Sequence, residues 1–387
     1  MSNIVLIYPN RLDECVISDA TPANWSVKLP LTNIQNPVIK KVARTNIGVR
    51  TVTLKINLAN QVRSIGGIAI INHNLTTNAK VRIEGFGGLD FKNSAGVTQT
   101  TGDRFDNGNL YRAYPIINPH DNGKNPFESR NWWLGSVDEA ERKSYTPVTA
   151  YYPPDNQMCQ SLRITITDTV TVGATSTAGV LIGKGQKTFT GLSVSNAFYS
   201  GQKITIYSNA NNANFMSGEV SSCVGDTLIL NVSAIGGNGT STDWQIISGD
   251  NFLQIGRIII GKAIEPARNP EYGDYSIGYT DLSEKQLASD NTKYFYLKPK
   301  MRVVNFTLKH LNHTEALSGF LDAQRELGLS GELLFTLSKP DYVGNINMPA
   351  DKNTYANTFL CNFAELNPLT NVYVGGWSNT LKLEEIV

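Results

Sequence analysis

The segments SLRITITD (Ser161–Asp168) and NFLQIGRIIIG (Asn251–Gly261) decide how the chain is divided. Both are rich in β-branched and aliphatic residues, which is typical of β-strands. We interpret them as the two arms of one antiparallel pair. Between them lies a block rich in Gly, Ser, Thr and Asn that has a β pattern of its own. The sequence therefore predicts a small β module, residues 171–247, inserted into a hairpin of a larger β domain.

The N-terminal part of the chain shows the alternation of half-buried strands. Three such stretches are RTVTLKINL (Arg50–Leu58), SIGGIAIINHNL (Ser64–Leu75) and AKVRIEGF (Ala79–Phe86). In the first of them, from Thr51 on, every second residue is aliphatic and the others are Thr, Lys or Asn, as expected when one face packs on a core. Short strands separated by turns predict a jelly-roll β-sandwich, residues 1–170 plus 248–270.

The insert repeats this pattern on a smaller scale. Its strands are expected within SGQKITIYSNANNANFMSGEV (Ser200–Val220) and GDTLILNVSAIGG (Gly225–Gly237), and glycines punctuate them. Strands this short, joined by glycine-rich turns, predict a compact barrel-like module.

The C-terminal part contains the one clear helical pattern of the chain. HTEALSGFLDAQRELG (His313–Gly328) places Leu and Phe side chains on one face, with Thr314 as the expected N-cap and Gly328 as the C-cap. Strands are expected before and after it, in the order β-α-β-β-β. We therefore predict a linker over residues 271–293 and a β-sandwich flanked by one α-helix over residues 294–387.

Composition excludes several classes of function. Lys and Arg number 34 and Asp and Glu number 33, so the net charge of +1 argues against a nucleic-acid-binding surface or an anionic-membrane anchor. The four cysteines are far apart in the sequence and form no CxxC pair, so no zinc or iron–sulfur motif is present. No stretch approaches the ~20 apolar residues of a membrane span, and the N-terminus lacks the pattern of a signal peptide.

A long stretch between the predicted strands, residues 87–158, is rich in aromatic residues. Loops of this length in a compact domain usually carry a function or a small structure of their own. Two interpretations stand side by side. Tyr111, Trp132 and Trp133 are candidates for an exposed contact with a glycan or a protein, or the two tryptophans cap the core of the sandwich.

No catalytic or metal-binding motif is present in the sequence. There is no GxSxG elbow. His310 and His313 could form a metal-binding pair, but they straddle a strand-to-helix turn, and a solvated turn explains them more simply. Asp138, Glu139 and Glu141 could serve a glycosidase, but a solvated loop or first helical turn explains them more simply. We therefore expect no enzyme activity, no catalytic residues, no metal site and no cofactor.

Three parts of the chain resemble known families. VTLKINLANQVRSIGGIAIINHNLTTNAKVRIEG, completed by SLRITITD and LQIGRIIIGKA, resembles discoidin-type, galactose-binding-like jelly rolls. GKGQKTFT, FYSGQKITIYSNANNANFMSGEV, DTLILNV and GGNGTSTDWQI are similar, in that order, to a small β module of phage tail fibres and tail-tip proteins. NPEYG and EALSGFLDAQRELG resemble the tube-like C-terminal part of siphophage tail-tip and distal tail proteins.

The resemblance implies a structural protein of a phage tail tip or baseplate. Such a protein would assemble in the host cytoplasm and reside in the virion, at the distal end of the tail. Its partners would be further copies of itself in a homo-oligomeric ring, the tail tube and other tail-tip or baseplate proteins. The alternative is a carbohydrate-binding adhesin that contacts a glycan on the host surface, and the two roles are compatible.

Overall fold

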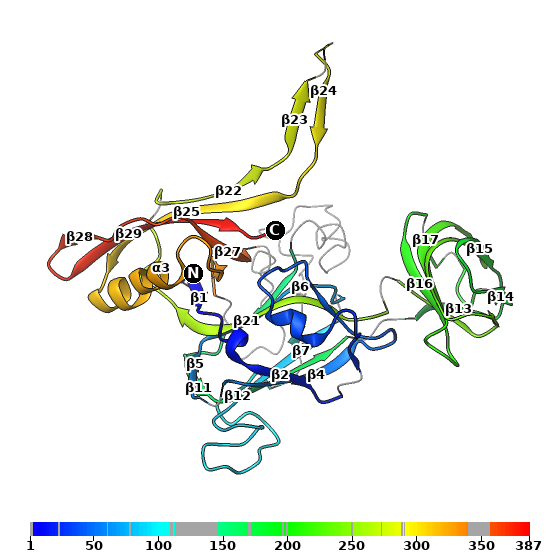
Figure 1. The fold of residues 1–387 in the computed structure, drawn as a ribbon, viewed down its shortest axis with the longest axis horizontal. Coiled ribbons are helices and arrows are strands. Elements are labelled where there is room, and N and C mark those ends of the chain that lie inside the picture. Colours follow the sequence, from blue (N-terminus) through cyan, green and yellow to red (C-terminus); the bar gives the residue numbers. More distant parts are fainter. Residues whose placement is uncertain are drawn as a thin grey trace.

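The computed structural model describes residues 3–387 apart from 22–23, 60, 77–78, 109–110, 113–145, 169–171, 196, 199, 249–250, 272, 288, 290 and 340–356. The described part confirms the predicted fold class. It is mainly β, with antiparallel sheets and one short helix (Figure 1).

One sheet of the N-terminal sandwich has the strand order β2-β4-β12-β7-β8, with β9 beside β7. Its strands are Val16–Asp19 (β2), Thr51–Asn57 (β4), Ser161–Thr167 (β12), Lys80–Phe86 (β7), Phe105–Asp106 (β8) and Tyr111–Arg112 (β9). Alternate aliphatic side chains of β4 and β12 are buried, as the period of two predicts.

The facing sheet is built around the long strand β21 (Gln254–Ile264), which pairs with β6 (Gly67–His73). The other strands here are Val148–Tyr151 (β10) and Ala43–Arg44 (β3), with Arg63–Ile65 (β5) and Gln157–Cys159 (β11) as a separate pair. The 3₁₀ turns Arg11–Glu14 (η1) and Leu31–Gln35 (η3) lie against β21. Isoleucines of β6 and β21 meet those of β4 and β12 in one core.

Ser161–Asp168 and Asn251–Gly261 do not pair with each other, so their interpretation as one antiparallel pair is wrong. β12 pairs with β4 and β7, whereas β21 pairs with β6, β1 and β3 in the opposite sheet. Both strands bury aliphatic residues in the same core from opposite sides. The periodicity of a strand fixes which face is buried, but it does not specify the partner strand. The insert therefore lies in a connection that crosses between sheets.

The insert forms a sheet with the order β13-β20-β16-β17-β18-β15. Its strands are Val172–Ser176 (β13), Val180–Leu181 (β14), Gly185–Phe189 (β15), Lys203–Ser208 (β16), Phe215–Val224 (β17), Thr227–Gly236 (β18), Thr240–Ser241 (β19) and Trp244–Ser248 (β20). It encloses a core of its own around Trp244, whose indole nitrogen donates to the Ala178 carbonyl at 2.9 Å. Figure 1 shows the insert beside the body of the chain.

A buried arginine holds the chain on both sides of the insert. The Arg50 guanidinium forms an ion pair with Asp168, at the end of the incoming strand. It also donates to the carbonyl oxygens of Phe252, at 2.7 Å, and Asn74, at 2.9 Å. Because one side chain reaches both ends of the insert, the two connections enter the sandwich side by side.

The C-terminal sheet continues from the sandwich through the first strand of the chain. β1 (Val5–Tyr8) pairs with β21 on one side and with β26 (Leu333–Thr336) on the other, and all its residues are buried. The order continues β26-β27-β29-β25-β22, with β28 beside β29. These strands are Thr358–Glu365 (β27), Gly376–Glu385 (β29), Lys300–Leu311 (β25), Tyr275–Asp281 (β22) and Thr370–Tyr373 (β28).

The helical pattern covers one face of this sheet, as predicted. A π-helical segment, η4 (Glu315–Leu321), runs into α3 (Asp322–Leu327), and Phe320 joins the core of the sheet. The expected N-cap is wrong. Thr314 is already helical and makes no side-chain cap bond, whereas Asn312 and Glu315 bond each other's backbone N–H groups at 2.8 and 2.9 Å. This reciprocal pair is a capping box shifted by two residues.

The segment 271–293, expected as a linker, contains strands instead. β22 lies in it, followed by Glu284–Leu287 (β23), which pairs with Lys293–Tyr296 (β24). These strands bury almost no side chain, so their sequence lacks the apolar alternation of a core strand. For this reason their polar composition was interpreted as a linker.

Excising the insert tests whether it is an independent unit. Because its core is separate and its ends meet at Arg50, replacing residues 170–249 with a short Gly/Ser linker is expected to leave the remaining fold intact. The excised module, residues 171–248, is expected to unfold in a cooperative transition of its own. Circular dichroism melts of both pieces check this, and an unfolded module or a collapsed remainder would contradict it.

Substitution of Arg257 tests how the sandwich is joined to the C-terminal sheet. Arg257 is fully buried and donates to Asp13 at 2.6 Å and to Glu332 at 2.9 Å. Arg257→Leu removes the partner of both carboxylates and is expected to cost roughly 3 kcal/mol of unfolding free energy. Arg325→Leu, which removes a surface ion pair, is the control and is expected to cost about 0.5 kcal/mol or less. Urea unfolding measures both, and equal effects would contradict the assignment.

Candidate assembly surface

A two-stranded arm extends from the C-terminal sheet. β22 and β25 pair from Tyr275↔Phe306 to Asp281↔Lys300, and β23 and β24 continue the same hairpin beyond them. We call residues 282–298 the arm. Figure 1 shows it projecting from the body of the chain, away from the sandwich.

Local sequence explains why the arm forms a hairpin. Lys-Tyr-Phe-Tyr in β24 has high β propensity, and Asn291 in the turn adopts a positive φ of 64°, a conformation that asparagine tolerates. At the base of the arm, the Ser283 hydroxyl accepts a hydrogen bond from the Lys298 backbone N–H at 3.0 Å. The ammonium of Lys298 pairs with Glu284 and lowers the pKa of that carboxyl.

The arm exposes aromatic side chains on both of its faces. Residues directly opposite in an antiparallel pair share a face, so Tyr294 and Tyr296 lie with Gln286 and Glu284. Phe295 lies on the other face, opposite Lys285. Tyr296 is 68% exposed and Phe295 57% exposed. An isolated two-stranded hairpin is marginal in water, and an exposed apolar patch of this kind marks an interaction site.

The charges differ between the two faces. On the tyrosine face, the one carboxylate is already paired with Lys298. On the Phe295 face, Lys285 and Lys293 flank the ring and Leu287, and no ion pair engages either lysine among the described residues. Among the described residues, this face therefore combines a phenyl ring with two lysines that form no ion pair.

A second exposed apolar patch lies on the β28–β29 hairpin. Val372 and Tyr373 are largely exposed, and Val374 at the turn is fully exposed. The Tyr373 hydroxyl bonds the His310 ring at 3.1 Å, which ties the hairpin to the irregular part of β25. Figure 1 shows this hairpin and the arm leaving the C-terminal sheet in different directions.

Almost all of the site residues suggested by the sequence lie outside the described structure. Tyr111 lies in β9 opposite Val81, and its side chain is outside the described part. Trp132 and Trp133, like Asp138, Glu139 and Glu141, lie outside the described residues altogether. Whether these aromatic residues contact a glycan, a protein or the core stays a prediction. Among the described residues, no cluster of His, Cys, Asp or Glu could hold a metal ion.

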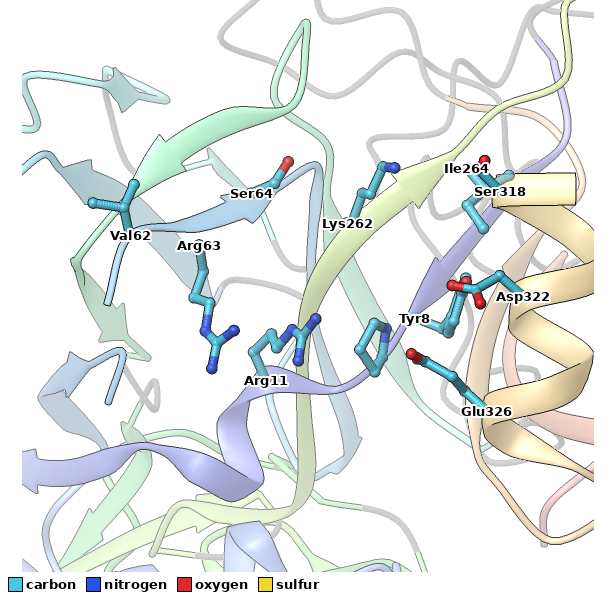
Figure 2. A pocket seen from close by; sticks show the side chains of 11 residues that line it. Tyr8, Arg11, Val62, Arg63, Ser64, Lys262, Ile264, Ser318, Asp322 and Glu326 are labelled. Atoms are coloured by element: carbon cyan, nitrogen blue, oxygen red, sulfur yellow. The ribbon is translucent and has the colours of Figure 1, made fainter. Parts of the chain in front are cut away.

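A pocket of about 300 Å³ lies where the sandwich meets the helix. Figure 2 shows Asp322 and Glu326 extending from α3 toward it, with Arg11 and Arg63 on the opposite side. Both arginines pair with Glu14, at 3.7 and 2.8 Å.

The acidic wall of the pocket is also engaged within the chain. Asp322 pairs with Arg325 at 2.6 Å. Burial, and then the charge of Asp322, raises the pKa of Tyr8, so its phenol stays protonated at neutral pH. The charged residues on both walls therefore already have ion-pair partners within the chain, and the pocket is a polar cavity between two parts of the chain.

The arm would have been missed by a search for catalytic or ligand motifs. Its signal in the sequence is YFYL (Tyr294–Leu297), an aromatic run in an otherwise polar segment. By sequence alone, a short apolar run beside turn residues can be a buried strand or an exposed one. The exposure of Tyr294–Leu297 follows only from the arrangement of the neighbouring strands.

No protein-family model matches the sequence, and no curated protein matches it. Among solved structures, a mycobacterial arabinofuranosyltransferase is similar at 10% identity and a TM-score of 0.19, with 99% of this chain and 26% of that chain covered. This chain thus spans about a quarter of the transferase. A fucolectin from the serum of striped bass, Morone saxatilis, is similar at 7% identity and a TM-score of 0.19, with 66% and 99% covered. Scores this low show no shared fold and carry no argument about function.

In the described part of the chain, no helix has the length and apolar character needed to cross a membrane.

Alanine substitutions of one exposed and one buried phenylalanine test whether the arm contributes to the stability of its own chain. Phe295→Ala in the arm is expected to change the unfolding free energy of the isolated chain by less than about 0.5 kcal/mol, because the ring is exposed. Phe335→Ala, in the fully buried β26, is the matched control and is expected to cost roughly 3–5 kcal/mol. Thermal and urea melts at low protein concentration compare them. A large loss for Phe295→Ala would show that the arm serves the fold of its own chain.

Proposed function

We propose that this chain is a structural protein of a phage tail tip or baseplate, similar to distal tail proteins, that assembles into a ring at the distal end of the tail. The arm carries this proposal. Its aromatic residues are exposed on both faces, and such a ribbon gains stability when a neighbouring subunit covers it.

The arrangement of the chain is consistent with an architectural role. The arm leaves the C-terminal sheet on the side away from the sandwich and the insert (Figure 1). A ring formed through the arm would therefore leave the sandwich and the insert free to face outward.

The mechanism is assembly, with no chemical step. Exposed aromatic rings that become desolvated between subunits are strong contributors to affinity, and free strand edges add backbone hydrogen bonds. β22 ends the described sheet order and offers such an edge. The ring would in turn contact the tail tube and other tail-tip or baseplate proteins.

The oligomeric state of the purified chain tests the proposal. We expect closed rings in mass photometry and negative-stain images, and we expect these rings to bind the ends of tail tubes when tubes are added. An arm-deletion variant replaces residues 282–299 with Asn-Gly, a two-residue hairpin turn that joins the paired Asp281 and Lys300. This variant should remain folded and monomeric. A wild-type chain that is monomeric with and without tubes would contradict the proposed function.

A further inference from the structure

We infer that the arm of one copy binds the β28–β29 hairpin of the next copy. This inference rests on the proposed function, since it names the contact that closes the ring. The occupant of the arm is thus a second copy of this chain, and the contact joins two different surfaces of the same protein.

The number and placement of the apolar patches favour this contact. A two-fold symmetric dimer needs one self-complementary patch, whereas a ring of identical subunits needs two different patches on each subunit. Among its described residues, the C-terminal part offers two, the arm and the turn at Val372–Val374. The arm continues the β22–β25 hairpin and the turn joins β28 to β29, and the two leave the C-terminal sheet in different directions (Figure 1).

The arm offers enough apolar surface for a stable interface. Tyr294, Phe295 and Tyr296 are each roughly three-fifths exposed. At about 200 Å² for each ring, they present on the order of 400 Å². With the exposed Leu282, Leu287 and Leu297, the two faces of the arm together approach the roughly 800 Å² that each partner contributes to a standard interface.

Charge argues for the hairpin and against a second arm as the partner. If two arms met through their Phe295 faces, Lys285 and Lys293 would face the same two lysines of the other copy. The hairpin tip, residues 370–378, contains no charged residue. An apolar, uncharged tip can cover the phenyl ring without repelling its two flanking lysines.

Two substitutions separate the two halves of the contact. Phe295→Asp disables the arm, and Val374→Asp disables the hairpin. Each is expected to weaken self-association at least tenfold in the dissociation constant, measured by analytical ultracentrifugation, because a charge replaces a side chain that the partner would bury. Val27→Asp is the matched control. Val27 lies in the sandwich and is 96% exposed, about as much as Val374, and its substitution should leave the rings unchanged.

Mixing the two defective variants gives the decisive measurement. The Val374→Asp chain keeps an intact arm, and the Phe295→Asp chain keeps an intact hairpin. One good contact can therefore form between them, but no second one. We expect an equal mixture to form dimers of 1:1 composition and nothing larger, whereas each variant alone stays monomeric. Coincident thermal melts of all variants with wild type establish that the substitutions act on association and not on folding.

Three other outcomes would overturn the inference. If Val374→Asp still forms rings while Phe295→Asp does not, the arm binds another arm or another surface. If both variants form rings that bind tubes, the proposed function stands and the arm–hairpin contact falls. If wild type forms no ring even with tubes, both the proposed function and this contact fall.

Discussion

The architecture depends on the burial of one short strand, β1, between two others. Its hydrogen bonds run to β21 on one side and to β26 on the other, so a four-residue segment from the start of the chain joins the sandwich to the C-terminal sheet. Leu6 faces the core beneath the helix, whereas Val5 and Ile7 face a different core shared with the sandwich. Because both faces and both edges are used, the two parts are held as one continuous sheet.

That continuity gives the projecting parts a fixed base. The insert is held at its neck by Arg50, and the arm grows from β25, which is anchored in the sheet by β29 and by the buried pair of Arg302 and Glu385. Buried ion pairs of this kind fix geometry more than they add net stability. A rigid base limits the entropy lost when a projecting hairpin is immobilised by a partner, and this favours binding through the arm.

Much of the fold was predictable from the sequence, and the failures have a common cause. Alternation of aliphatic residues in Arg50–Leu58 and in the insert correctly indicated strands, and the helical spacing around Phe320 correctly indicated the helix. The pairing of Ser161–Asp168 with Asn251–Gly261 was wrong, as was Thr314 as the N-cap. The candidate surface was not foreseen, because its strands are exposed and their sequence looks like a connector.

By itself, the sequence determined the local state of most segments and the absence of catalytic motifs. Local state follows from neighbouring residues, through propensity, periodicity and turn chemistry. Only the tertiary structure decided that β1 lies between β21 and β26, that β12 and β21 lie in opposite sheets, and that the aromatic run at residues 294–297 is exposed. These properties depend on which distant strands come together, and a strand's own sequence specifies its buried face but not its partner.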